Sequence, residues 1–103
     1  MQQNGGYLYI ITNDAFKNWV KIGTTDNLEK RLSNYQTGDP NRGYKLIYSL
    51  HHPLYKEAER KIKETMKPFA TDIKNEWYCV DINIAVSRIE EQLDEYNLKL
   101  LTN

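Results

Sequence analysis

Two short segments near the N-terminus, each rich in β-branched and aromatic residues, constrain the fold of this chain more than any other feature. They span residues 7–12 and 19–22, and a polar stretch, residues 13–18, separates them. This composition is typical of strands, and the polar stretch suits a hairpin loop. Alternate residues of a strand share one face, so we expect Tyr9 and Lys21 to lie side by side on one face of the hairpin.

A helix and a third strand are predicted next. Asp26 followed by Glu29 is a variant of the capping box, and Gly38 with Pro40 provides a stop, so the helix is expected at residues 27–37. The third strand is expected at residues 44–50, where the pattern alternates. The residues predicted to form its one buried face are Tyr44, Leu46, Tyr48 and Leu50.

Two more helices and a short strand complete the predicted order. A helix begins at Pro53 and ends before Pro68, a strand covers residues 77–80, and a last helix covers about residues 81–97. The apolar residues of the last helix recur at helical spacing, which predicts one packed face. They are Ile82, Ala85, Val86, Ile89, Leu93 and Tyr96, followed by Leu100 and Leu101.

The predicted order is β-β-α-β-α-β-α with a hairpin at its start. This order suggests an α+β fold, a small and mainly antiparallel sheet flanked by helices. At 103 residues the chain has the size of one domain. We therefore expect a single domain over residues 1–103, with a motif core at about residues 6–80.

The formal net charge is zero, which argues against a protein that coats nucleic acid by bulk electrostatics. Residues 1–80 nevertheless carry twelve Lys and Arg against nine Asp and Glu, so a basic surface is expected to be local. The single cysteine, Cys79, cannot form an internal disulfide, and no apolar run is long enough to span a bilayer. We expect a cytoplasmic, intracellular protein without a membrane partner, in which Cys79 packs as a small hydrophobe in its strand.

Three short motifs have a spacing that suggests phosphodiester chemistry. A Gly-x-x-Tyr sequence ends at Tyr9, a Lys-Ile-Gly sequence begins at Lys21, and Arg31 follows ten residues later. This combination resembles the GIY-YIG nuclease superfamily, over about residues 6–78, and is closest to its compact branch in phages and large DNA viruses. The resemblance implies the same small sheet with helices and a metal-dependent endonuclease that cleaves DNA.

The resemblance implies roles for residues of the hairpin and of the first helix. Tyr9 would sit by the attacking water as general base, which requires a nearby cation because free tyrosine has a pKa near ~10. Lys21 stands where the family has its second tyrosine, and an ammonium beside Tyr9 would favour the phenolate. Arg31 would grip the phosphate, with Tyr35 one turn further on the same helix face. The alternatives are structural, with both tyrosines packed in a core and both cations solvated.

The resemblance further implies one glutamate as the metal ligand, and helical geometry selects Glu59 on the second helix. Glu59 borders the apolar arc of that helix and can point along the sheet surface, whereas Glu57 and Glu64 lie further out. A single carboxylate can anchor Mg²⁺, or Mn²⁺ in its place, because Mg²⁺ keeps several waters and takes other oxygens from phosphate. The alternative is an ion pair of Glu59 with Lys56 or Lys63.

An asparagine is the last polar residue that the resemblance implies. Rigid counting leads to Thr71, whereas Asn75 fits the branch whose motif ends in Glu-Trp followed by an aromatic residue, so Asn75 is the preferred candidate. Basic side chains on the second helix form a face that either follows a DNA backbone or is simply solvated. The predicted DNA-binding residues of this face are Lys56, Arg60 and Lys63.

These features predict a divalent-metal-dependent endonuclease that acts on DNA. One alternative is a DNA-binding module with the same fold and no cleavage, which the lysine at position 21 favours. Another is an interaction protein that dimerises through its last helix. A chain of this length leaves no room for an appended targeting domain, so we expect either recognition of DNA structure or a partner protein that delivers the enzyme.

Overall fold

The computed structural model describes residues 5–102, without the side chains of residues 93 and 95–102. The described residues form one five-stranded sheet with three α-helices and a short 3-10 helix. The strands are β1 (Gly6–Asn13), β2 (Trp19–Thr25), β3 (Tyr44–His52), β4 (Asp72–Lys74) and β5 (Trp77–Cys79). The helices are α1 (Leu28–Thr37), α2 (Tyr55–Met66), η1 (Lys67–Phe69) and α3 (Ile82–Thr102).

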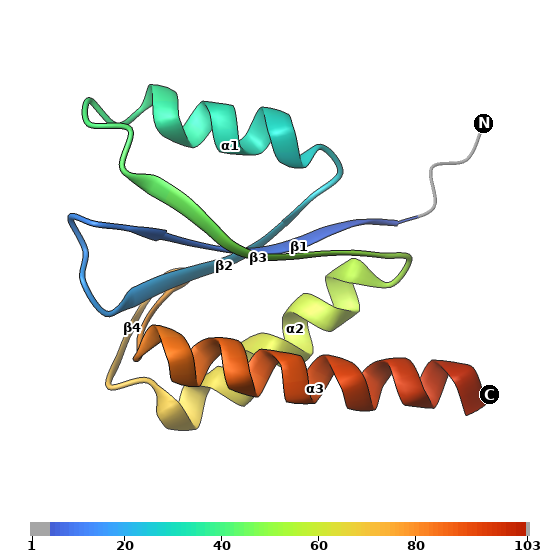
Figure 1. Cartoon of the computed structure of the whole chain (residues 1–103). Coiled ribbons are helices and arrows are strands. Elements are labelled where there is room, and N and C mark those ends of the chain that lie inside the picture. The colour runs from blue at the N-terminus through green and yellow to red at the C-terminus, as the bar shows by residue number, and fades with distance from the viewer. Residues whose placement is uncertain (1–4, 103) are drawn as a thin grey trace.

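The sheet has the strand order β3-β1-β2-β5-β4, so the N-terminal hairpin forms its centre. Every pair of neighbouring strands is antiparallel. Figure 1 shows α1 on one face of the sheet and α2 with α3 on the opposite face. The predicted fold class, an α+β fold with a small antiparallel sheet flanked by helices, is confirmed.

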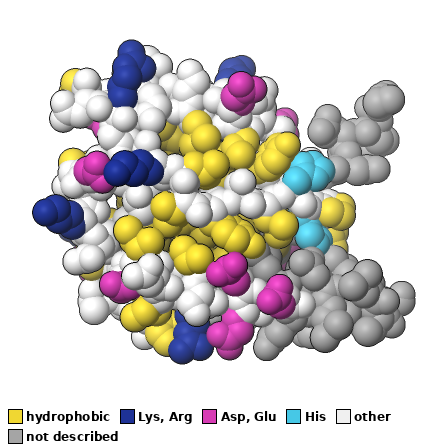
Figure 2. Space-filling view, in the orientation of Figure 1, with side chains coloured by type: hydrophobic (Ala, Val, Ile, Leu, Met, Phe, Trp, Pro, Cys, Tyr) yellow, Lys and Arg dark blue, Asp and Glu magenta, His cyan; other side chains and the backbone are white. Residues whose placement is uncertain are grey.

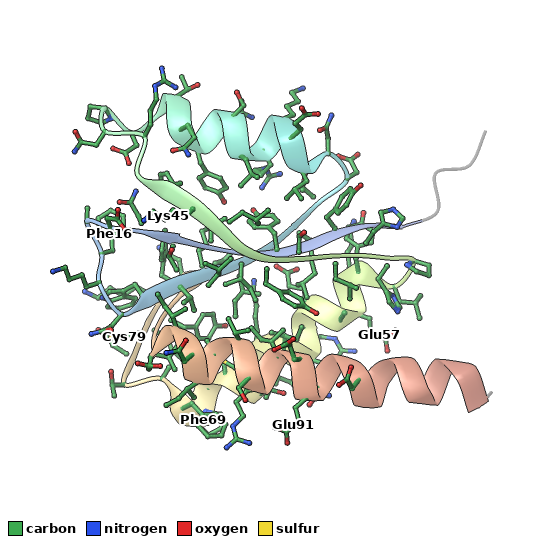
Figure 3. All side chains as sticks on the ribbon, viewed as in Figure 1. Phe16, Lys45, Glu57, Phe69, Cys79 and Glu91 are labelled. Atoms are coloured by element: carbon green, nitrogen blue, oxygen red, sulfur yellow. The ribbon has the colours of Figure 1, made fainter. Side chains whose placement is uncertain are left out.

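The hydrophobic core lies between the sheet and the pair α2 and α3, where side chains fill the layer between the ribbons (Figure 3). On α2, Ala58, Ile62 and Met66 are spaced four residues apart and therefore line one side of the helix. Alternate residues of β1 and β2 meet them from the sheet. The buried cluster that defines this core face is Leu8, Ile10, Val20, Ile22, Ala58, Ile62, Met66, Tyr78, Val80, Ala85 and Ile89.

The opposite face of the sheet, which we call the α1 face, carries the residues of β1 and β2 that alternate with the core residues, among them Tyr9 and Lys21. Helix α1 covers it without burying any residue of its own. The helix begins after Asn27, whose side chain accepts a hydrogen bond from the Lys30 amide at 3.0 Å. The predicted cap at Asp26 is therefore wrong by one residue, because Asn27 is the extended residue immediately before the helix.

Strand β3 departs from the predicted alternation because it contains a bulge. Its register with β1 shifts between Ile10 and Ile11, so Ile10 pairs with Tyr48 while Ile11 pairs with Leu46. One extra residue in a strand reverses the facing of all residues beyond it. The prediction of a single buried face is thus wrong: Tyr48 faces the core, whereas Leu46 is 40 % exposed. The same reversal brings Tyr44 to the α1 face.

Strand β4 was not predicted. All three of its residues are exposed, so the segment lacks the alternating pattern that identifies a half-buried strand. It pairs with β5 through a two-residue turn, in which Asn75 adopts a positive φ of 56°. Asparagine tolerates this left-handed conformation better than most residues, and such turns favour it.

Charge is distributed unevenly over the surface. Figure 2 shows acidic side chains gathered over α3, in agreement with the exposed Glu90, Glu91 and Asp94. Of the helices within residues 5–102, none combines the length and the apolar composition that crossing a membrane requires. The side chains of Leu93, Tyr96, Leu100 and Leu101, which belong to the predicted dimerisation stripe, lie outside the described residues.

Candidate functional site

The centre of the α1 face is the buried Tyr9, which is 1 % exposed. Its hydroxyl lies 3.0 Å from the Tyr35 hydroxyl, and Arg31 Nη1 donates to it over a longer distance of 3.4 Å. Gly23 stands opposite Tyr9 on β2, where a Cβ atom would lie 2.6 Å from the Tyr9 hydroxyl. The glycine therefore makes the space that the phenol ring occupies.

Helix α1 supplies both partners of Tyr9. Arg31 and Tyr35 are four residues apart, so they lie one above the other on the same side of the helix. The Tyr9 and Tyr35 rings meet edge to face, with centroids 6.3 Å apart. Arg31 is exposed, so its guanidinium is available to an anion from solvent.

Lys21 does not lie beside Tyr9, so this expectation was wrong. In the hairpin register Lys21 pairs with Ile11, whereas Tyr9 pairs with Gly23. The Lys21 ammonium lies over the Tyr35 ring, 5.0 Å from its centroid. Lys21 is thus a diagonal neighbour of Tyr9 in the sheet and approaches the centre of the site through Tyr35 of α1.

The expected phenolate of Tyr9 has no support in this geometry. Burial raises the pKa of Tyr9 above its ordinary value, the hydrogen bond to Tyr35 raises it further, and the opposing attraction of Arg31 is smaller. Desolvation disfavours the charged form of a phenol. Tyr9 is therefore a neutral phenol near neutral pH.

Two carboxylates converge on one cation at the edge of the site. Lys63 Nζ lies 2.9 Å from a carboxylate oxygen of Glu59 and 2.9 Å from one of Glu76. Glu59 also accepts a hydrogen bond from Thr24 Oγ1 at 3.4 Å. The ion-pair alternative for Glu59 is thus present, with Lys63 rather than Lys56 as its partner.

Glu76 joins the carboxylate pair to the residues of the α1 face. It lies 3.9 Å from Lys21 Nζ, and Lys21 in turn lies over Tyr35. Contacts therefore run without a break from Arg31 through Tyr9, Tyr35, Lys21, Glu76 and Lys63 to Glu59. The structure brings these seven residues into one network.

The two carboxylates are the described groups best suited to a divalent cation. Both reach the point that Lys63 Nζ occupies, and Mg²⁺ needs only one or two carboxylates because it keeps several waters. Within residues 5–102, no group of three or more His, Cys, Asp or Glu side chains is placed to hold a metal. Glu59 and Glu76 fit a hydrated Mg²⁺ once Lys63 has turned away, which a long and flexible side chain permits.

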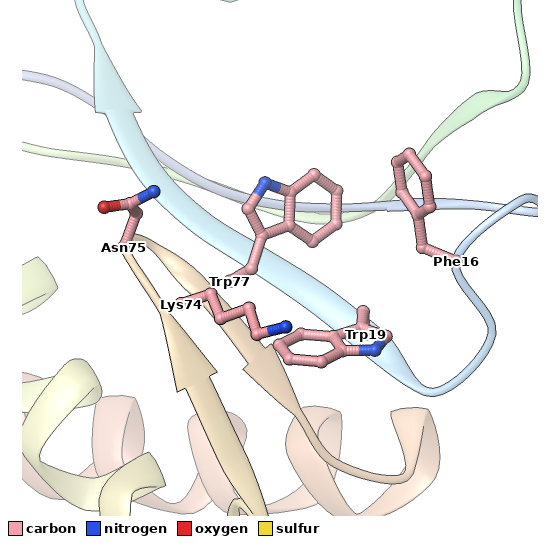
Figure 4. A pocket seen from close by; sticks show the side chains of 5 residues that line it. All are labelled: Phe16, Trp19, Lys74, Asn75 and Trp77. Atoms are coloured by element: carbon pink, nitrogen blue, oxygen red, sulfur yellow. The ribbon is translucent and has the colours of Figure 1, made fainter.

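Asn75, Lys56 and Arg60 are not part of this network. Asn75 lines a hollow together with Lys74 and three aromatic rings (Figure 4). On α2, Lys56 lies over the Tyr55 ring at 5.9 Å, and Arg60 is 4.0 Å from Glu57. Lys63 is held between carboxylates, so it belongs to the network rather than to a free basic face.

Sequence reasoning missed Glu76 and the aromatic residues around Trp77. Glu76 occupies the second position of the β4–β5 turn, directly after Asn75. The signal was present, because an Asn-initiated pair between two short strands is typical of a tight hairpin. Because β4 was not predicted, the sequence did not indicate that the β4–β5 turn would place Glu76 near Lys21.

The family model described as the T5orf172 domain matches residues 6–97 of the chain. No curated protein and no solved structure matches significantly. The family comprises nuclease-like, DNA-binding domains, so it is compatible with DNA binding. The match is to this family and not to GIY-YIG, which corrects the assignment that the motifs suggested. The chain belongs to the T5orf172 domain family.

Proposed function

We propose that this domain is a divalent-metal-dependent endonuclease that hydrolyses DNA phosphodiester bonds at the network around Tyr9. The observation that supports it best is the exposed Arg31 guanidinium held beside a fixed hydroxyl, 3.4 Å from Tyr9. A guanidinium can grip two phosphate oxygens at once. A phosphate bound there would lie next to both tyrosine hydroxyls.

Substrate binding also exposes Tyr9 in this proposal. The Arg31 contact is long for a hydrogen bond, and a phosphate offers the guanidinium stronger, charge-assisted bonds. As Arg31 swings toward the phosphate, the hydroxyl of Tyr9 becomes free to bind the attacking water.

A neutral Tyr9 can still receive a proton. It accepts one from the attacking water while passing its own hydroxyl proton to Tyr35, to which it is hydrogen-bonded at 3.0 Å. Tyr35 is half-buried and releases its own proton to solvent. The water becomes the nucleophile, and no phenolate is needed.

Glu59 and Glu76 would hold the divalent metal, which supplies positive charge to the phosphate oxygens and to the leaving oxygen. Lys63 pairs with the carboxylates when no metal is bound, and this compensates the charge of the half-buried Glu59 and of the exposed Glu76. Lys21, at 3.9 Å from Glu76, adds a second positive charge beside that carboxylate.

A nicking assay on supercoiled and branched DNA tests this proposal. The wild type is assayed with Mg²⁺, with Mn²⁺ and with EDTA, beside Tyr9→Phe, Arg31→Gln and Glu59→Gln. Lys30→Gln is the matched control, because Lys30 is the exposed neighbour of Arg31. We expect metal-dependent nicking that is lost in the three site variants and kept in the control.

A DNA-binding module without cleavage is the second candidate. It is favoured by the burial of Tyr9, which is 1 % exposed, and by Lys63, which already fills the space between the two carboxylates. DNA binding by wild type and Glu59→Gln alike, without nicking under any metal condition, would establish this candidate and exclude the enzyme.

A further inference from the structure

A row of aromatic rings leads from the candidate site to the hollow at the end of the sheet. Tyr9 meets Tyr35, Tyr35 meets Tyr44 with centroids 5.1 Å apart, and Tyr44 meets Trp77 at 6.4 Å. Trp77 then meets Phe16 edge to face at 5.6 Å. The rings come from α1, from the three strands β1, β3 and β5 and from the loop between β1 and β2, so the row exists only in the folded chain.

The hollow at the end of this row has a volume of about 310 Å³. This lies at the lower end of the ~300–1,000 Å³ that is usual for ligand pockets, and therefore suits a flat group the size of one nucleobase. Figure 4 shows Trp19, Trp77 and Phe16 around it, with Asn75 at the turn above. Phe16 is 45 % exposed although it is a large apolar residue.

The polar groups of the hollow match a nucleotide. The Lys74 ammonium lies 5.8 Å from the centroid of the Trp19 ring and can meet a backbone phosphate there. The Asn75 amide offers both a donor and an acceptor, which a base edge requires. The Asn75 backbone adopts a left-handed conformation in the turn, and the residue lines the rim of the hollow.

We propose that the hollow formed by Phe16, Trp19 and Trp77 binds one unpaired base of single-stranded DNA. This inference rests on the proposed function and names its substrate class, DNA with an unpaired strand beside the cleaved bond. Bases stack on exposed aromatic rings whatever their sequence, and cations nearby hold the backbone. A paired base cannot enter the hollow, because its faces are covered by its neighbours in the duplex.

Tryptophan fluorescence reports on this hollow alone, because the chain has two tryptophans and both line it. The full-length Glu59→Gln protein is titrated in EDTA with a short oligothymidylate, with an abasic strand of equal length and with a blunt duplex. We expect a change in fluorescence with oligothymidylate and binding roughly tenfold weaker with the abasic strand, since stacking is the difference between them.

Variants of residues that line the hollow test whether the base-dependent binding takes place there. Trp77→Ala should weaken oligothymidylate binding roughly tenfold and leave the abasic strand unaffected, while Trp77→Phe restores a stacking surface. Asn75→Gly removes the amide, and glycine tolerates the left-handed turn, so this variant tests the hollow without loss of folding. Phe69→Ala is the control, because Phe69 is 40 % exposed and lies on η1, away from the hollow.

Each outcome separates the two proposals. Equal binding of the oligothymidylate and the abasic strand, with unchanged fluorescence, would overturn the base site and leave a DNA-binding enzyme intact. No binding to any of the three DNAs would overturn the proposed function and the base site together. Base-dependent binding without nicking would uphold the base site and exclude only cleavage.

Discussion

The two faces of the sheet differ in what they bury. The core between the sheet and the helices α2 and α3 holds a cluster of eleven buried hydrophobic or aromatic residues, five of them on the two helices, whereas α1 on the other face contributes no buried residue. The α1 face instead gathers tyrosine hydroxyls, a lysine and an arginine around Tyr9. Apolar burial stabilises a fold, while polar groups held on a rigid sheet bind and react. The division suggests that one face carries the stability and the other the function.

Removal of a core side chain should have the largest effect on stability. Ile62 is fully buried on α2, so Ile62→Ala is expected to lower the free energy of unfolding by about 2–5 kcal/mol. Leu32 of α1 is half-buried, and Leu32→Ala should cost about 1 kcal/mol. Urea denaturation of both variants measures the two losses in the free energy of unfolding. Equal losses would mean that the two faces of the sheet contribute equally to stability.

A methyl group at Gly23 should disturb the α1 face directly. Its Cβ would lie 2.6 Å from the Tyr9 hydroxyl, so Gly23→Ala must displace the ring, at a cost of about 1–3 kcal/mol. Gly38→Ala is the matched control, since its nearest neighbour would be 3.6 Å away and its φ is −80°. Thermal unfolding and the nicking assay read out both variants. Wild-type behaviour of Gly23→Ala would show that the ring of Tyr9 is free to move.

Alkaline pH should weaken the fold through buried tyrosines on both faces. Burial raises the pKa of Tyr9 on the α1 face and of Tyr48 and Tyr78 on the core face. A raised native pKa contributes stability that is complete below the unfolded pKa, near ~10, and is lost as pH rises through the native pKa.

The sensitivity to alkali can be assigned to Tyr9 by one variant. Tyr9→Phe should cost about 1 kcal/mol at neutral pH, through the lost hydrogen bonds, and should make stability fall less steeply above about pH 10. Urea denaturation across this range, with tyrosinate absorbance, measures both effects. An unchanged slope would place the alkaline sensitivity on the core face alone.

Among these variants, a replacement of Lys63 should change the free energy of unfolding least. Its clearest effect should be on the affinity for a divalent metal. Lys63→Gln removes partly exposed ion pairs with Glu59 and Glu76, so the free energy of unfolding should change by less than about 1 kcal/mol. The carboxylates then lose the cation that lies between them, and only the longer contact of Glu76 with Lys21 remains. Calorimetry should therefore show tighter Mn²⁺ binding than in the wild type or in Lys56→Gln. Unchanged Mn²⁺ affinity would mean that Glu59 and Glu76 do not hold the metal.

Local patterns predicted most of the fold. The hairpin of β1 and β2, the helices and the third strand follow from periodicity and from turn residues, which depend on neighbours in sequence. The bulge in β3 and the short strand β4 could not be predicted from these local patterns. The bulge depends on pairing with β1, and β4 consists of exposed residues that gain strand geometry only from β5.

The sequence named most of the residues of the network, but neither Glu76 nor the contacts that join them. Motif spacing selected Tyr9 and Arg31, helical geometry selected Glu59, and the structure joins the three through a chain of contacts. The place of Lys21 over Tyr35 and the arrival of Glu76 required the register of three strands. The protonation of Tyr9 also escaped prediction, because desolvation depends on everything packed around the ring.

The sequence by itself determined the fold class, because propensity and periodicity are local properties of the chain. Only the tertiary structure decided that a lysine stands between the two carboxylates and that the aromatic row ends in a hollow. These features join residues from α1, α2 and the β4–β5 turn. Their distances are set by sheet register and helix packing, which no short segment of sequence contains.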